Sequence, residues 1–343
     1  MKIPLKNIYW LLFYAWKGDP LCGKRKVVID DIKMPQDLLG MILKISMSQI
    51  LTQGLARNYK ERTEEIIGLR GRPLLALSAS RRLLAQGKSI CLVDELDTDI
   101  ACNQIAKAAI TKILKTKIDS AIAADLHQIL NKLISVSEPP DPIALFRNLQ
   151  LGSNDRRYQI VIECARLIFC SGVPNTEGTG SVFRDFRDDD KLMEWIFEEF
   201  VRQFAKRHVL SWKDSRSSRM HWGIEPNALI PSLKTDITLT TEKQSLIVET
   251  KCNKEIVQSN NFSQEKVRSS HLQQLYSYLG GERHRTNLPP DQIRGLLLYA
   301  QPEVGVVNTD TRLHEFNISI RSLNLNREWS LIDADLREWL KPQ

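Results

Sequence analysis

Apolar residues recur at helical spacing between residues 191 and 208, where the sequence reads KLMEWIFEEFVRQFAKRH. A stripe of this kind predicts an amphipathic helix whose apolar face packs on a core. Two short runs that favour strands, 237–240 and 245–251, follow it and are separated by a polar turn. Together they predict a β-hairpin. A second helix is predicted over 262–279 and a buried strand over 295–299, so this half of the chain mixes helices with strands.

The first half of the chain has mainly helical periodicity. The predicted elements are an aromatic-rich helix within 1–16, strands at 27–29 and 66–67, and helices at 38–59, 105–114, 121–134 and 156–170. A glycine-containing loop at 171–179 is the preferred domain boundary, and the prolines of 137–142 mark a competing one. We therefore predict an N-terminal α+β region over residues 1–175 and a second domain over 176–343.

Three charged residues of the predicted hairpin have the composition of a metal-dependent site. Glu249 and Lys251 are two residues apart, so they project from the same face of a strand, while Thr250 points away. Asp236 heads the neighbouring strand and can lie opposite them. Carboxylates suit Mg²⁺, and a lysine can orient a water or stabilise negative charge in the transition state. This arrangement is the D-x(n)-E-x-K pattern of the PD-(D/E)xK nucleases; the alternative is an ordinary solvated face.

Two helices that flank the hairpin add polar residues to this pattern. Glu198 borders the apolar stripe of the upstream helix, and Gln274 and Tyr278 share one face of the downstream helix because they are four residues apart. The resulting order of elements resembles the RecB-like branch of the PD-(D/E)xK fold. It predicts an α/β domain in which a mixed sheet is flanked by helices. The alternatives are an exposed helix carboxylate for Glu198 and ordinary helix-to-sheet packing for the other two.

Length and composition set only broad limits. A chain of 343 residues can form two or three domains. The net charge of +7 suits a polyanionic partner, although the basic residues are spread along the chain. The six cysteines contain no CxxC pair, which argues against a zinc ribbon or an iron–sulfur cluster. The apolar run 8–16 is too short to span a bilayer, so we expect a cytoplasmic protein.

Residues 87–89 (GKS) resemble the end of a Walker A loop, and 90–95 resemble a Walker B strand. A P-loop requires a glycine five residues before Gly87, where this chain has Arg82. It must also follow a strand and open a helix, whereas this GKS precedes a strand. We therefore do not expect the chain to hydrolyse nucleotides by itself.

Longer motifs give a resemblance that covers nearly the whole chain. They are the opening IPLKNIYWLLFYAW, the central RNYKERTEEIIGLRGRP and CLVDELDTDIACNQIAKAAI, and the later FEEFV, TDITL, IVETK and HLQQLYSYL. With these motifs the sequence resembles the McrC family, the nuclease subunits of McrBC-type modification-dependent restriction systems. The first motifs are the more specific ones because they serve no generic chemistry.

The resemblance implies a Mg²⁺-dependent DNA endonuclease that works with an McrB-like AAA+ GTPase hexamer. That partner would bind GTP and recognise modified double-stranded DNA, and the N-terminal region of this chain would dock on it and stimulate it. The implied catalytic residues are Asp236, Glu249, Lys251, Glu198 and Gln274, with Asp236, Glu249 and Glu198 as metal ligands. Thr235 stands where the motif name has proline, which is not a ligand position.

Basic residues in the N-terminal region are candidates for contacts with the partner. We expect some of Arg70, Arg72, Arg81, Arg82 and Lys88 to hold the partner or to stabilise its GTPase transition state. The alternative is a solvated basic face. Two further functions stay open from the residues alone: an autonomous RecB-like exonuclease or repair nuclease, and a non-catalytic AAA+ adaptor.

Overall fold

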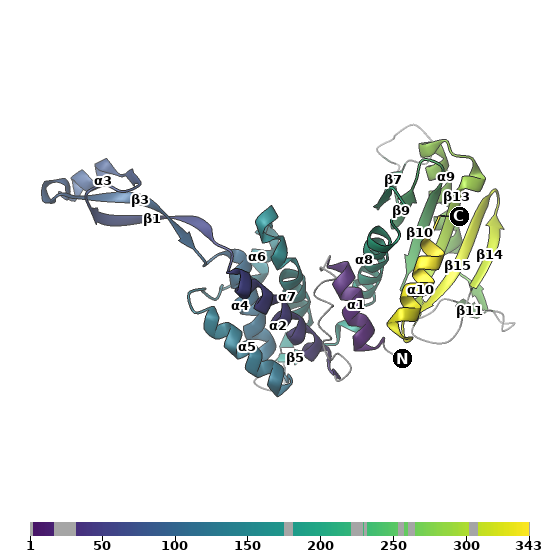
Figure 1. Ribbon diagram of the computed structural model, residues 1–343, viewed down its shortest axis with the longest axis horizontal. Coiled ribbons are helices and arrows are strands. Elements are labelled where there is room, and N and C mark those ends of the chain that lie inside the picture. The colour runs from purple at the N-terminus through teal and green to yellow at the C-terminus, as the bar shows by residue number, and fades with distance from the viewer. Residues whose placement is uncertain are drawn as a thin grey trace. The chain divides into compact units, whose positions relative to one another are not determined.

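The computed structural model describes residues 3–16, 32–174, 181–220, 229, 232–252, 257–259, 265–301 and 308–342. The chain forms two compact units, which we name by their main features (Figure 1). The sheet unit consists of Met1–Pro35 and Asp185–Gln343, and the arm unit consists of Gln36–Arg184. No helix among the described residues is long and apolar enough to cross a membrane.

A six-stranded mixed sheet forms the centre of the sheet unit. Its strands, in spatial order, are β14 (Asn308–Leu313), β15 (Phe316–Asn324), β13 (Ile293–Gln301), β10 (Ser245–Lys251), β9 (Ile237–Thr240) and β6 (Asp214–Arg216). Strand β10 is parallel to β13, and β13 is parallel to β15, whereas the remaining pairs are antiparallel. Two short pairs lie outside this sheet, β7 (Arg219–Met220) with β8 (Leu233–Lys234) and β11 (Val257–Ser259) with β12 (Glu265–Val267).

In the sheet unit, the helices α8 (Asp190–His208), α9 (Ser269–Thr286) and α10 (Trp329–Leu340) pack on the sheet, and α1 (Leu5–Ala15) packs on α8. The unit also has 3₁₀ turns at Phe186–Asp188 and Pro290–Gln292. The side chain of Asp189 accepts a hydrogen bond from the backbone N–H of Leu192 and so caps the start of α8. The apolar stripe of α8 is fully buried, and α9 packs on β13 and β10. The predicted fold class, a mixed sheet flanked by helices, is confirmed.

The arm unit combines packed helices with a small antiparallel sheet. Its helices are α2 (Pro35–Gln53), α4 (Ala101–Leu114), α5 (Ser120–Lys132), α6 (Pro142–Asn148) and α7 (Gln159–Ser171), and β4 (Gly172–Pro174) pairs with β5 (Ser181–Phe183). A three-stranded sheet of β1 (Asn58–Ile67), β3 (Lys88–Asp97) and β2 (Arg72–Pro73) carries the short helix α3 (Leu75–Ser80). Figure 1 shows β1 and β3 extending away from the helices of this unit. We call residues 58–97 the arm.

Charged side chains explain how the arm forms strands without an apolar alternation. Nearly all of β1 is exposed, and its charged residues pair with β3 across the ladder, as Arg62 does with Glu95 at 3.2 Å and Lys88 with Glu65 at 3.0 Å. Cross-strand pairs of opposite charge favour this register. The structure therefore extends the short strand predicted at 66–67 to ten residues.

The division into units differs from the predicted division at residue 175. Helix α1 belongs to the sheet unit, because the Tyr14 ring lies 5.7 Å from that of Phe200 and Asn7 Nδ2 donates to the Leu325 carbonyl at 2.6 Å. Residue 175 itself and the strand predicted at 27–29 lie outside the described residues.

Two predicted helices have different bounds in the structure. The helix predicted over 38–59 ends at Gln53, before Gly54 with its left-handed φ of +88°. The helix predicted from 262 begins at Ser269, because 265–267 form β12.

Candidate active site

Glu249 and Lys251 meet at the end of β10. Their spacing of two residues places both side chains on one face, and Lys251 Nζ lies 2.5 Å from Glu249 Oε1. The Glu249 side chain is completely buried, and its Oε2 has no hydrogen-bond partner among the described residues. Burial raises the pKa of Glu249 to about 7, with a further contribution from Asp236 and an opposing one from Lys251. One oxygen of this carboxylate is therefore buried without a compensating donor.

Asp236 is held beside this pair by the neighbouring strand. It directly precedes β9, which runs antiparallel to β10 with Ile237 opposite Val248. The Asp236 Oδ2 accepts hydrogen bonds from the backbone N–H of Thr250 at 2.8 Å and from its hydroxyl at 2.9 Å. Strand alternation had indicated that Thr250 points away from the site, yet it orients the Asp236 carboxylate.

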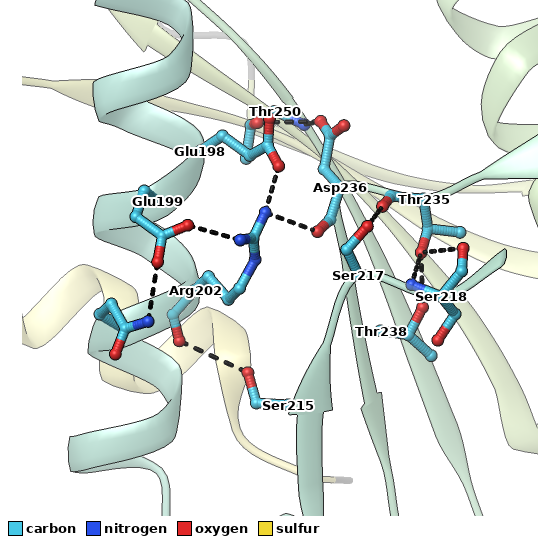
Figure 2. A network of polar contacts seen from close by, with 11 residues as sticks. Glu198, Glu199, Arg202, Ser215, Ser217, Ser218, Thr235, Asp236, Thr238 and Thr250 are labelled. Carbon is cyan, nitrogen blue, oxygen red and sulfur yellow. Dashed lines mark hydrogen bonds and ion pairs between the residues drawn. The ribbon is translucent and has the colours of Figure 1, made fainter. Parts of the chain in front are cut away.

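The Thr235 side chain forms hydrogen bonds that hold the chain in place just before β9. Its Oγ1 accepts from the Ser218 N–H at 3.0 Å and lies 2.8 Å from Thr238 Oγ1 (Figure 2). The residue that replaces the motif's proline is therefore buried in a hydrogen-bond network.

Glu198 approaches the site from α8. Figure 2 shows the Arg202 guanidinium between the Glu198 and Glu199 carboxylates and the backbone of Asp236. Arg202 forms an ion pair with Glu198, lies 2.5 Å from Glu199 Oε2, and donates to the Asp236 carbonyl at 3.3 Å. Burial raises the pKa of Glu198, and the negative charge of Asp236 raises it further. Glu198 is thus a half-buried carboxylate beside Asp236 rather than a freely exposed one.

Helix α9 borders the site with polar groups. Gln274 Nε2 donates to the Tyr278 hydroxyl at 2.9 Å. Burial is the main cause that raises the pKa of Tyr278, and the charges of Glu249 and Asp236 also raise it. The structure therefore brings the Gln274–Tyr278 pair close to the carboxylates.

A histidine and a tyrosine near Lys251 were not among the predicted site residues. His271 Nδ1 and the Tyr299 hydroxyl are 2.9 Å apart and share a hydrogen bond, and Tyr299 lies opposite Lys251 in the β10–β13 ladder. Burial lowers the pKa of His271, and the charge of Lys251 lowers it further. The only sequence signal was that His271 lies three residues before Gln274, on the same side of the helix.

The carboxylates fit a divalent cation in their chemistry but are not gathered into one ligand set. No group of three or more His, Cys, Asp or Glu side chains within the described ranges is arranged to hold a metal ion. Glu198, Asp236 and Glu249 each contact a donor within the protein. However, Glu249 Oε2 has no hydrogen-bond partner in the described part of the chain, and Asp236 raises the pKa of both other carboxyl groups. A divalent cation would relieve both features, so the donor set suits one.

Comparison with known proteins identifies the family. The protein-family model described as McrBC 5-methylcytosine restriction system component matches residues 24–300, which is most of the chain. The chain belongs to this family. A curated relative, the type IV methyl-directed restriction enzyme EcoKMcrBC of Escherichia coli (strain K12), is 28% identical over 340 residues, covering 97% of this chain and 96% of the relative. The resemblance indicated by the sequence motifs is confirmed.

A solved structure of the McrBC type has a similar fold. The refined half-complex from the tetradecameric assembly of Thermococcus gammatolerans McrB AAA+ hexamers with bound McrC matches with a TM-score of 0.60 at 15% identity, covering 98% of this chain and 75% of that chain. The cryo-EM structure of the Thermococcus gammatolerans McrBC complex matches with a TM-score of 0.44 at 15% identity, covering 60% of this chain and 59% of that chain. The first of these likenesses supports the McrBC-type fold.

In this family member, the basic residues predicted to contact a partner all lie in the arm. They are Arg70, Arg72, Arg81, Arg82 and Lys88. The four arginines are exposed, and Lys88 is paired with Glu65. Residues 87–89 lead into strand β3, so they have no P-loop geometry.

Proposed function

We propose that this chain is the DNA endonuclease subunit of a modification-dependent restriction complex. The observation that carries the proposal is the completely buried Glu249 carboxylate, with one orphaned oxygen, next to Asp236 and Lys251. Burying a carboxylate in this way is costly, and such costs are typical of functional sites. Membership in the McrBC family supports the same conclusion.

Each polar residue of the site has a distinct part in the proposed hydrolysis of a phosphodiester bond. Asp236 and Glu249, with Glu198, would hold Mg²⁺, which supplies Lewis-acid charge and lowers the pKa of a bound water. Thr250 fixes the orientation of Asp236 through two hydrogen bonds.

Lys251 is the residue proposed to act on the transition state. Its amino group is held by Glu249 and its side chain is only 12% exposed, so its charge can stabilise the negative charge that develops on the phosphate. Burial opposes the charged form of Lys251, but Glu249 and Asp236 outweigh it and raise the pKa of the amine. The lysine therefore stays protonated, and it orients water or phosphate rather than abstracting a proton. Gln274 and Tyr278 add hydrogen-bonding groups at the border of the site.

The proposed partner is an McrB-like AAA+ GTPase hexamer. The Thermococcus gammatolerans assembly contains McrB AAA+ hexamers with bound McrC, and the Escherichia coli relative is a methyl-directed restriction enzyme. By analogy, the partner would bind GTP and recognise modified double-stranded DNA, and the complex would act in the cytoplasm. This family-level analogy also accounts for the unsuitable geometry of residues 87–89 in this chain.

The arm is the segment that we expect to contact this partner. It exposes apolar side chains together with the basic ones, including Tyr59, Ile67 and Leu69, at 69%, 87% and 71% exposure. Single alanine substitutions of Arg70, Arg72, Arg81, Arg82 and Lys88 test the contact through the partner's GTPase rate. A set of variants that all stimulate GTP turnover as wild type does would remove the proposed role of these residues.

The nuclease proposal is tested on methylated and unmethylated plasmid in Mg²⁺, with and without the partner and GTP. Wild type should cut methylated plasmid only with both, and Asp236→Ala should not cut at all. Asp291→Asn, which removes an exposed carboxylate from the turn before β13, is the matched control and should cut like wild type. Cutting by wild type alone would indicate an autonomous nuclease. GTP stimulation without any cutting would indicate an adaptor.

A further inference from the structure

Arg202 is fixed among negative groups at the border of the carboxylate site. It follows Glu198 by four residues and Glu199 by three, so all three side chains lie on one side of α8. Its guanidinium contacts both carboxylates and the Asp236 carbonyl (Figure 2). Gln203 Nε2 donates to Glu199 Oε1 at 2.8 Å, which holds the Glu199 end in place. The Arg202 side chain is only 19% exposed, so its charge is partly shielded from water.

Asp236 has two carboxylate neighbours, Glu249 on β10 and Glu198 on α8. Glu249 and Glu198 are both influenced by its charge, which raises the pKa of each. On the Glu249 side, Lys251 contacts Oε1, and no described residue donates to Oε2. On the Glu198 side, one nitrogen of Arg202, Nη2, contacts both the Glu198 carboxylate and the Asp236 backbone oxygen. On the Glu198 side a protein cation therefore already links the Glu198 carboxylate to the Asp236 backbone, whereas Lys251 contacts the Glu249 carboxylate through one oxygen.

We propose that Arg202 is a permanent cation of this site, which takes the place between Glu198 and Asp236 and restricts the chain to one bound divalent ion. The inference rests on the proposed metal-dependent function and adds the number of ions to it. A guanidinium keeps its charge at any working pH and cannot be discharged to admit a second ion. Like charges a few ångströms apart repel strongly in a partly buried site. Arg202 is thus a positioning residue that holds Glu198 and excludes a second metal.

The number of bound ions is the direct readout. The full chain without DNA is titrated with Mn²⁺, and free Mn²⁺ is counted by electron paramagnetic resonance. Wild type should bind one ion, whereas Arg202→Gln should bind two, with the second ion at least about tenfold tighter than any second ion in wild type. Arg202→Lys keeps the charge and should bind one. Lys206→Gln removes an exposed positive charge from the same helix and should also bind one.

A second variant covers the case in which Arg202→Gln does not fold because Glu198 and Glu199 repel each other. Glu199→Gln with Arg202→Gln removes one negative and one positive charge, so the local net charge is unchanged while Glu198 and Asp236 remain. This double variant should also bind two ions. One ion in every variant, or two in wild type, would overturn the Arg202 inference and leave the metal site standing. No ion in wild type would overturn the metal site and the inference together.

Discussion

Replacing Glu249 with glutamine removes an ionisable group from the most buried position of the site. The pKa of Glu249 rises from 4.5 to about 7, chiefly because of burial and next because of Asp236. Below pH 4.5 the folded and unfolded chains both carry the proton. Between pH 4.5 and 7 the folded chain keeps a proton that the unfolded chain has lost, so stability falls as pH rises. Above about pH 7 both the folded and the unfolded chain have lost the proton from Glu249. The free energy of unfolding then no longer changes with pH through this group, and the stability that the proton gave at low pH is lost.

The size of the effect follows from the two pKa values. The interval from 4.5 to about 7, at about 1.4 kcal/mol for each pH unit, corresponds to about 3 kcal/mol in the free energy of unfolding. Glutamine does not titrate. The stability of Glu249→Gln relative to wild type should therefore increase by about 3 kcal/mol from pH 4.5 to 8, with most of the change between pH 5 and 7.

Urea unfolding in the presence of EDTA, followed by tryptophan fluorescence, measures this difference in the stability of the sheet unit between Glu249→Gln and wild type. All seven tryptophans of the chain lie within residues 1–35 or 185–343, so the signal reports the sheet unit. Glu242→Gln is the control, because Glu242 is exposed in the turn between the same two strands. Its stability relative to wild type should show no comparable rise with pH. A difference between Glu249→Gln and wild type that stays constant from pH 5 to 8 would refute the reasoning about burial.

Two further variants test which local interactions stabilise the site and the arm. Thr235→Val removes the acceptor of the buried Ser218 N–H and should lower the stability of the sheet unit by about 1–3 kcal/mol, seen as a lower urea midpoint in fluorescence; an unchanged midpoint would contradict this. Gly71→Ala should loosen the arm, because Gly71 has a φ of +68° and an added Cβ would lie 2.3 Å from the Leu92 carbonyl oxygen. Limited proteolysis should then cut within the arm faster while the fluorescence midpoint stays the same; equal cleavage rates would contradict the role of Gly71.

The periodicity of the sequence was sufficient to predict the helix and the strand on which most site residues lie. The apolar spacing predicted a helix over 191–208, and α8 spans Asp190–His208. A period of two placed Glu249 and Lys251 on one face, and their side chains are in contact. These predictions succeed because both patterns depend on neighbours within a single element, whose geometry is nearly fixed.

Such patterns could not predict the contacts between different helices and strands. An arginine four residues after a glutamate is common on exposed helices, and only the packing of α8 on β10 and β6 of the sheet brings Arg202 to the Asp236 carbonyl. The bond from Thr250 to Asp236 also escaped the alternation rule, because Asp236 precedes the paired part of β9. Helix α1 gave no signal for its partner, since its aromatic residues suit burial in either unit.

Each of the three carboxylates of the candidate site, those of Glu198, Glu249 and Asp236, is held in place by a nearby ion-pair or hydrogen-bond partner. Arg202 holds Glu198 within one turn of α8, Lys251 holds Glu249 two residues along β10, and Thr250 holds Asp236 from the adjacent strand. Three carboxylates this close repel one another, and the repulsion would turn unsupported side chains toward solvent. Because Arg202, Lys251 and Thr250 each contact a different one of these three carboxylates, the protein keeps all three in place. The site is therefore preorganised, and within the described part of the chain two of its buried polar atoms, Glu249 Oε2 and Arg202 Nε, have no hydrogen-bond partner.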